Sequence, residues 1–158
     1  MIWFTNDLHF NHINLIKNSR NMSPDVHDEL IIKNWNNVVS KKDKVFILGD
    51  ITREKPKLAI EYLNQLRGVK EVILGNHDID LAKYLVENKI KVNGSHEYKG
   101  YWLSHAPLHP SQVSFFFGNI HGHIHFSKED HTKLDLGENY LNVNTEFHDY
   151  FPWSMDEI

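Results

Sequence analysis

The stretch Val45-Phe46-Ile47-Leu48-Gly49-Asp50 consists of four apolar residues followed at once by a glycine and a carboxylate. A short apolar run that ends at a turn residue predicts a strand buried on both faces. Two further short, mostly apolar runs also end at polar residues, since Ile2–Asn6 leads into Asp7 and Val72–Leu74 leads into Gly75-Asn76-His77-Asp78. The repeated pattern predicts a sheet in which each strand is followed by polar residues that can bind ligands or take part in catalysis.

Helical patterns separate these three strands. Ser23-Pro24 combines a capping serine with a proline suited to the first helical position, so it predicts a helix start. Further helices are expected at Ile13–Asn18, from Pro56, and from Ile79 onward. After about residue 90 the pattern becomes mostly strands, expected at Ile90–Val92, Tyr101–Ser104, Phe115–Ile120 and Tyr140–Val143. Strands joined through helices favour parallel pairing, and hence an α/β fold.

Composition narrows the class of protein. The chain has 158 residues, a length typical of one domain, and we expect that domain to span 1–158. No export or membrane segment is recognisable, and the absence of cysteine is compatible with a reducing cytoplasm. A net charge of −4 argues against tight binding to duplex nucleic acid but leaves a small nucleotide open as substrate. The sequence also leaves open the possibility that the protein forms a homo-oligomer.

Histidine is abundant, with 12 residues that do not form a terminal run. In open α/β sheets, binding sites form at the carboxyl ends of strands, where the loops converge. Seven residues there have side chains that suit metal ions: Asp7, His9, Asp50, Asn76, His105, His123 and His125. This set contains two carboxylates, one amide and four imidazoles, which is more ligands than one metal ion usually binds. They suit two ions that share a bridging carboxylate and together clamp a phosphoryl group.

The order of these motifs resembles the calcineurin-like metallophosphoesterases. The motifs are Asp7-Leu8-His9, Gly49-Asp50, Gly75-Asn76-His77-Asp78, His105 and Gly122-His123-Ile124-His125. Asn34-Trp35-Asn36 and Leu141-Asn142-Val143-Asn144 also resemble a short bacterial and phage subgroup, in which the position of Asn11 is commonly glycine. The resemblance implies a four-layer α/β/β/α sandwich of two mixed sheets and metal-dependent hydrolysis of a phosphoester.

The resemblance also implies roles for individual residues. Asp7, His9 and His125 would bind the first metal, Asn76, His105 and His123 the second, and Asp50 would bridge the two. A hydroxide between the ions would be the nucleophile, His77 would lie near the leaving group, and Asp78 would orient His77. The predicted ligands contain no sulfur, which allows Mn, Fe, Zn, Ni or Co, and manganese is the metal that we expect.

Three further residues are candidates for contacting substrate: His12, Arg53 and His109. Capping or packing of the first helix competes with this role at His12, and a solvated loop position competes with it at Arg53. A small phosphodiester or nucleotide-type substrate is favoured over a monoester. The alternative function is a catalytically weak scaffold of the same fold that binds a protein partner, but it predicts damaged motifs, whereas Asp50 and His77 are both present. A binuclear hydrolase acting on an amide or carboxylic ester stays open too.

Overall fold

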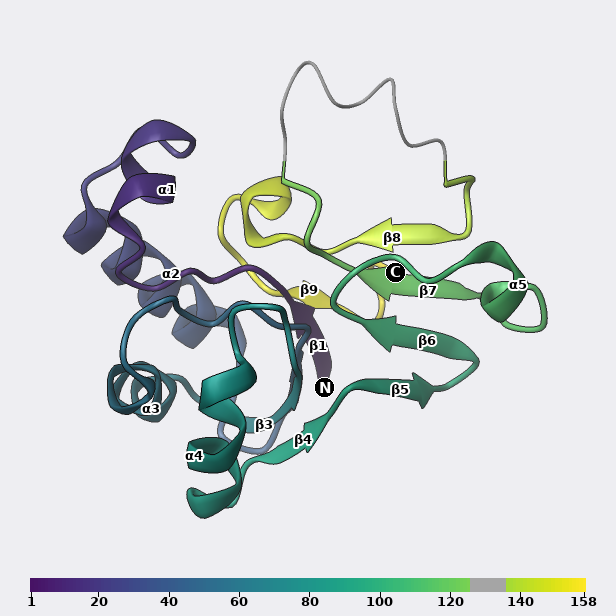
Figure 1. Ribbon diagram of the computed structural model, residues 1–158, viewed down its shortest axis with the longest axis horizontal. Coiled ribbons are helices and arrows are strands. Elements are labelled where there is room, and N and C mark those ends of the chain that lie inside the picture. The colour runs from purple at the N-terminus through teal and green to yellow at the C-terminus, as the bar shows by residue number, and fades with distance from the viewer. Residues whose placement is uncertain (126–135) are drawn as a thin grey trace.

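The computed structural model describes residues 1–125 and 136–158 and contains two packed β-sheets (Figure 1). The five-stranded sheet has the order β4-β3-β2-β1-β9. Its members are β1 (Ile2–Thr5), β2 (Lys44–Ile47), β3 (Val69–Ile73), β4 (Lys91–Asn93) and β9 (Trp153–Ser154). β1 to β4 run parallel to one another, and β9 pairs antiparallel with β1.

The second sheet has four strands in the order β5-β6-β7-β8. These are β5 (Ser95–Tyr98), β6 (Tyr101–Ser104), β7 (Gly118–His121) and β8 (Tyr140–Asn142). β5 pairs antiparallel with β6, whereas β6, β7 and β8 are parallel. Both sheets are therefore mixed, as predicted.

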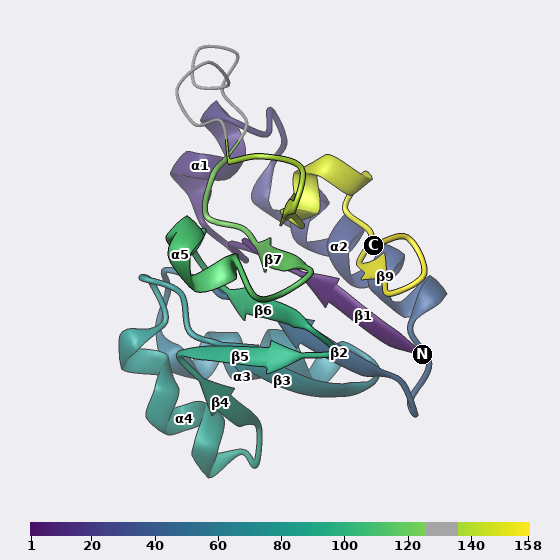
Figure 2. The same ribbon diagram turned by 90° about the vertical axis from the view of Figure 1, so that its right-hand side faces the viewer.

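Helices form the outer layers. The first sheet carries α1 (Ile13–Asn18), α2 (Pro24–Val38), α3 (Pro56–Gln65), the 3₁₀ turn η1 (Ile79–Leu81) and α4 (Ala82–Glu87). Figure 2 shows the second sheet in front of the first, with α2 and α3 behind both. The outer face of the second sheet carries the short α5 (Pro110–Val113), where the Trp102 indole N–H donates to the carbonyl of Gln112 at 3.1 Å. The four-layer α/β/β/α sandwich is thus confirmed, with a thin fourth layer.

Alternation along the strands builds two separate cores, because successive side chains of a strand point to opposite faces. Trp3, Val45 and Ile47 pack with Trp35 and Leu63 of the helices. The residues next to them face the other way: Phe4 and Phe46 lie between the sheets against Leu103 and Ile120. Burial on both faces explains why the first strands are recognisable as continuous apolar runs.

The strand expected at Phe115–Ile120 is the clearest correction. β7 begins only at Gly118, and Phe115 and Phe117 are 92% and 73% exposed. The backbone there continues the turn after α5, since the Phe116 N–H donates to the Val113 carbonyl at 2.9 Å. The apolar run Phe115-Phe116-Phe117 therefore belongs to an exposed turn and not to a buried strand.

Within residues 1–125 and 136–158, every helix is too short or too polar to cross a membrane.

Candidate metal centre

The predicted ligands follow the ends of strands in both sheets. Asp7 and His9 follow β1, Asp50 follows β2, and Asn76 follows β3 in the first sheet. His105 follows β6, while His123 and His125 follow β7 in the second sheet. The structure brings all seven to one edge, where the loops of the two sheets meet.

One group of ligand atoms surrounds a buried carboxylate oxygen of Asp7. Its Oδ1 lies 3.3 Å from His9 Nε2 and 3.2 Å from His125 Nε2, and the two nitrogens are 3.2 Å apart. Asp7 Oδ1 has no conventional hydrogen bond among the described residues. One oxygen and two imidazole nitrogens that converge in this way are a donor set suited to a divalent cation.

A second group forms around His105. Its Nε2 lies 2.9 Å from Asn76 Oδ1, 3.0 Å from His123 Nδ1 and 3.5 Å from Asp50 Oδ2. Asp50 Oδ2 is also 3.8 Å from His9 Nε2, which belongs to the first group. The carboxylate of Asp50 therefore lies between the two groups, at the position that a bridging ligand requires.

The backbone at these ligands is strained. Asp7, His9, Asp50 and His123 have left-handed φ values of 54°, 47°, 52° and 66°. Non-glycine residues rarely adopt this conformation, and it tends to cluster at functional sites. The Asp7 side chain helps to hold the geometry, because its Oδ2 accepts the His123 backbone N–H at 2.7 Å.

The charges of the first group are strongly coupled. Burial alone would raise the pKa of Asp7, but His125 and His9 outweigh it and hold that pKa well below its usual value. Burial alone would lower the pKa of His125, whereas contacts with Asp7 and Glu146 raise it to about 9. A cation that binds His125 at neutral pH must therefore displace a proton.

Sequence comparison identifies the family. The model of the calcineurin-like phosphoesterases matches residues 1–154. The chain belongs to the calcineurin-like phosphoesterase family. The archaeal protein MJ1445 of Methanocaldococcus jannaschii is 37% identical over 162 residues, which cover 99% of this chain and 88% of that protein. This phosphoesterase also matches the Gene 66 protein of Mycobacterium phage L5, with 44% identity over 81 residues, or 48% of this chain and 39% of the phage protein.

A solved structure supports the same assignment. The crystal structure of AQ665 from Aquifex aeolicus aligns with this phosphoesterase at a TM-score of 0.76 and 28% identity. The alignment covers 99% of this chain and 96% of that chain. The resemblance expected from the motifs is therefore confirmed, and family membership together with the two ligand groups fits a metal-dependent phosphoric ester hydrolase.

The two residues predicted for catalysis occupy different environments. His77 is partly exposed, and its Nε2 lies 3.7 Å from Asp50 Oδ2. Asp78 is buried and accepts the backbone N–H groups of Asp50, Ile51 and Gly75 at 2.7, 3.1 and 3.0 Å. Among the described hydrogen bonds none joins Asp78 to the His77 ring, so this carboxylate shapes the loop that carries Asp50, and its orienting role for His77 stays a prediction.

The three candidates for substrate contact lie in different places in the structure. His12 lies beside the first group of candidate ligands, with its Nδ1 3.3 Å from His9 Nδ1. Burial, aided by the charges of His9 and Arg53, lowers the pKa of His12 to about 4. Arg53 is exposed in the loop after β2. His109 instead caps α5, which lies at the start of β7 in Figure 1, and its Nδ1 accepts the Ser111 N–H.

Two residues beside the first ligand group were missed by the sequence analysis. Glu146 Oε1 lies 2.9 Å from His125 Nδ1, and its Oε2 accepts from the buried guanidinium of Arg20. Arg20 is one of three arginines in the chain, but nothing in its neighbourhood indicates burial. A contact between residues 126 positions apart depends on the complete fold, so no local signal identifies it.

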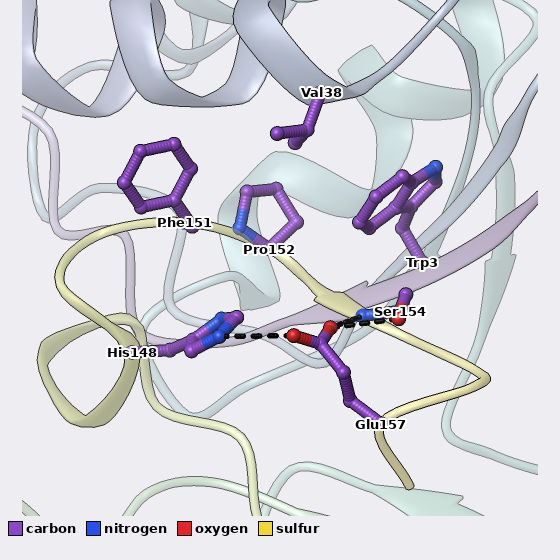
Figure 3. Close-up of a pocket in the computed structure, with 7 residues that line it drawn as sticks. All are labelled: Trp3, Val38, His148, Phe151, Pro152, Ser154 and Glu157. Atoms are coloured by element: carbon purple, nitrogen blue, oxygen red, sulfur yellow. Dashed lines mark hydrogen bonds and ion pairs between the residues drawn. The ribbon is translucent and has the colours of Figure 1, made fainter.

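A separate, mostly apolar cavity of about 430 Å³ lies between α2 and β9 (Figure 3). It is lined by Trp3, Val38, His148, Phe151, Pro152, Ser154 and Glu157. None of the predicted ligands is among these residues, so the cavity is distinct from the candidate metal centre.

Proposed function

We propose that residues 1–158 act as one binuclear metal-dependent phosphodiesterase domain. Asp7, His9 and His125 would hold one ion, Asn76, His105 and His123 the other, and Asp50 would bridge them. The observation that carries the proposal is the position of Asp50 Oδ2, which is 3.8 Å from His9 Nε2 in one group and 3.5 Å from His105 Nε2 in the other. Oxygen and nitrogen ligands without sulfur suit Mn, Fe, Zn, Ni and Co, and manganese is the ion we propose. The compartment we propose is the reducing cytoplasm.

The chemistry divides between the ions and the chain. When bound, two divalent ions supply Lewis acidity that neutralises the phosphate and lowers the pKa of water between them. His77 projects toward the same cluster, with its ring centroid 5.8 Å from that of His9, while remaining partly open to solvent. From this position a proton held at Nε2 can be donated to the leaving alkoxide, a contribution typically worth about 10²–10⁴-fold.

The exposure of the second ligand group favours a diester. Asn76 and His123 are exposed, so this side of the cluster opens to solvent. A phosphate bound there can carry a substituent on either side without entering the protein core. This open arrangement supports the proposal of a small diester or nucleotide-type substrate.

Hydrolysis of bis-p-nitrophenyl phosphate tests the proposal. Metal-stripped protein is assayed with and without Mn²⁺, beside p-nitrophenyl phosphate and the variant Asp50→Ala. We expect Mn²⁺-dependent diesterase activity that exceeds the monoesterase activity and disappears in Asp50→Ala. Full activity in that variant would refute the bridging role, and higher monoesterase activity would refute the substrate class. Absence of activity with Mn²⁺, Ni²⁺, Fe²⁺ and Zn²⁺ would favour the scaffold function instead.

A further inference from the structure

Glu146 and Arg20 link the ligand His125 to the loop that carries Asp7 and His9. Glu146 lies on the 3₁₀ turn η2 (Thr145–His148), and its Oε1 is 2.9 Å from His125 Nδ1. The ring nitrogen on the other side of His125, Nε2, faces Asp7 Oδ1 at 3.2 Å. A carboxylate on Nδ1 thus leaves Nε2 as the nitrogen that faces the ligand cluster.

Arg20 distributes its donors between this carboxylate and the first ligand loop. Its Nε and Nη2 donate to Glu146 Oε2 at 2.8 and 2.7 Å. Nη2 also donates to the Asp7 carbonyl at 2.7 Å, and Nη1 donates to the Leu8 carbonyl at 3.2 Å. Arg20 is only 7% exposed, so these contacts form away from bulk water, where charged hydrogen bonds are strong.

The contacts join three segments that lie far apart in sequence. They hold the strained backbone at Asp7 and His9 and the ring of His125 in one fixed arrangement. Lysine could not replace Arg20, since a single ammonium group lacks the planar set of donors that reaches a carboxylate and two carbonyls together.

We propose that Glu146 and Arg20 are positioning residues for the first metal site only. Glu146 fixes the ring orientation of His125, and Arg20 fixes Glu146 relative to the Asp7–His9 loop. The inference rests on the proposed metal centre, which supplies the two sites to be compared. Partners of this kind typically contribute about 10–100-fold in metal affinity.

The test is a Mn²⁺ titration of metal-stripped protein, followed by electron paramagnetic resonance. Free Mn²⁺ gives the affinity of each site, and the spectrum distinguishes an interacting pair of ions from a single ion. Glu146→Gln keeps the size of the side chain but removes the charge that pairs with Arg20. We expect one site to weaken about 10–100-fold and the paired-ion spectrum to give way to that of a single ion.

Glu157→Gln is the matched control. Glu157 also pairs with a histidine, since its Oε1 lies 3.3 Å from His148 Nε2, but this pair borders the separate cavity (Figure 3). We expect the Glu157→Gln variant to bind both Mn²⁺ ions with the affinities of the unchanged protein. Arg20→Lys is a second variant, for which we expect the same selective loss of one site.

The outcomes separate the inference from the proposed function. If the unchanged protein fails to bind two Mn²⁺ ions, the proposed binuclear centre is wrong and the inference falls with it. If the unchanged protein binds two and Glu146→Gln binds both with equal affinity, only the inference is overturned. Equal weakening of both sites, or failure of both variants to fold, would also overturn it, because either result indicates a role in the whole fold.

Discussion

At Gly122, the absence of a side chain allows the two sheets to meet. A Cβ there would lie 1.7 Å from Asn6 Nδ2 and 2.5 Å from Asn144 Oδ1, closer than atoms can approach. The Gly122 N–H donates to the His105 carbonyl at 2.8 Å, and the next residue, His123, donates its N–H to Asp7. This turn therefore holds ligands from both sheets in register.

Gly122→Ala should accordingly destabilise the protein. Because Asn6 must move, we expect a loss of about 1–3 kcal/mol, the usual cost of overpacking a buried site. Urea unfolding of the metal-free variant and of the metal-free unchanged protein measures this loss in the free energy of unfolding. Gly94→Ala is the control, since a Cβ at Gly94 would meet nothing within 4 Å. Equal stability of the two variants would show that Asn6 relaxes freely.

His77→Ala should retain metal but lose turnover. The His77 ring lies beside the two ligand groups of the proposed centre without belonging to either of them. We expect the two Mn²⁺ ions to stay bound while kcat falls about 10²–10⁴-fold, most severely for poor leaving groups that need a proton. Metal stoichiometry and kcat for diesters of graded leaving-group pKa provide the measurement. Loss of an ion would instead make His77 a ligand.

Single residues were predictable from sequence where a short motif carries them. The seven ligand candidates lie within a few residues of strand ends, and the structure gathers all of them at one edge. Glu146 and Arg20 have no such motif, and their proximity arises only when residues 20, 125 and 146 fold together. The position of Asp78 was predictable, but its contact with the backbone of Asp50 was not, because aspartate next to a histidine gives no sign of which group it binds.

Among the elements, strands buried on both faces were the easiest to predict. β1, β2 and β3 are buried throughout their carboxyl halves, and the sequence predicted each of them within a few residues of its bounds. β5 was missed because its sequence, Ser95-His96-Glu97-Tyr98, is polar and alternates between exposed and half-buried positions at a sheet edge. β9 has only two residues and exists through its pairing with β1, a contact that sequence periodicity does not reveal.

An ion cluster at Glu71 connects three strands of the first sheet. The carboxylate on β3 lies 2.7 Å from Lys44 Nζ of β2 and 2.8 Å from Lys91 Nζ of β4. Burial alone would raise the pKa of Glu71, but the two lysines and Asn93 outweigh it and lower the pKa from 4.5 to about 2. A folded-state pKa below the unfolded value means that this group stabilises the protein above pH 4.5. The contribution is lost as the pH falls from 4.5 toward 2.

Glu71→Gln should therefore lower stability in a pH-dependent way. At pH 7 we expect a loss of roughly 2 kcal/mol, since one pKa unit corresponds to about 1.4 kcal/mol and the exposed lysine is partly screened. The difference from the unchanged protein should shrink between pH 4.5 and 2. Urea unfolding of the metal-free proteins across this pH range measures the difference in the free energy of unfolding. Glu61→Gln is the control, because Glu61 is exposed. A difference that stays constant with pH would contradict the ionic origin.

At the scale of the molecule, the proposed metal centre lies where the two sheets meet. The first sheet supplies Asp7, His9, Asp50 and Asn76, and the second supplies His105, His123 and His125. Each proposed ion would therefore be held by ligands from both sheets and would cross-link the sandwich. The unfolded chain does not assemble such a ligand set, so binding stabilises the folded state selectively.

Mn²⁺ should consequently raise the thermal unfolding midpoint of the whole protein. At a free concentration 100 times the dissociation constant, one site contributes about 2.7 kcal/mol. For a chain of this size that corresponds to a rise of about 5–10 °C. Calorimetry of metal-stripped protein, with Mn²⁺ and then with excess chelator, measures the rise and its reversal. Asp50→Ala should show a much smaller rise, because it removes the ligand between the two groups. An unchanged midpoint with Mn²⁺ would mean that the gathered ligands do not bind metal across the sheets.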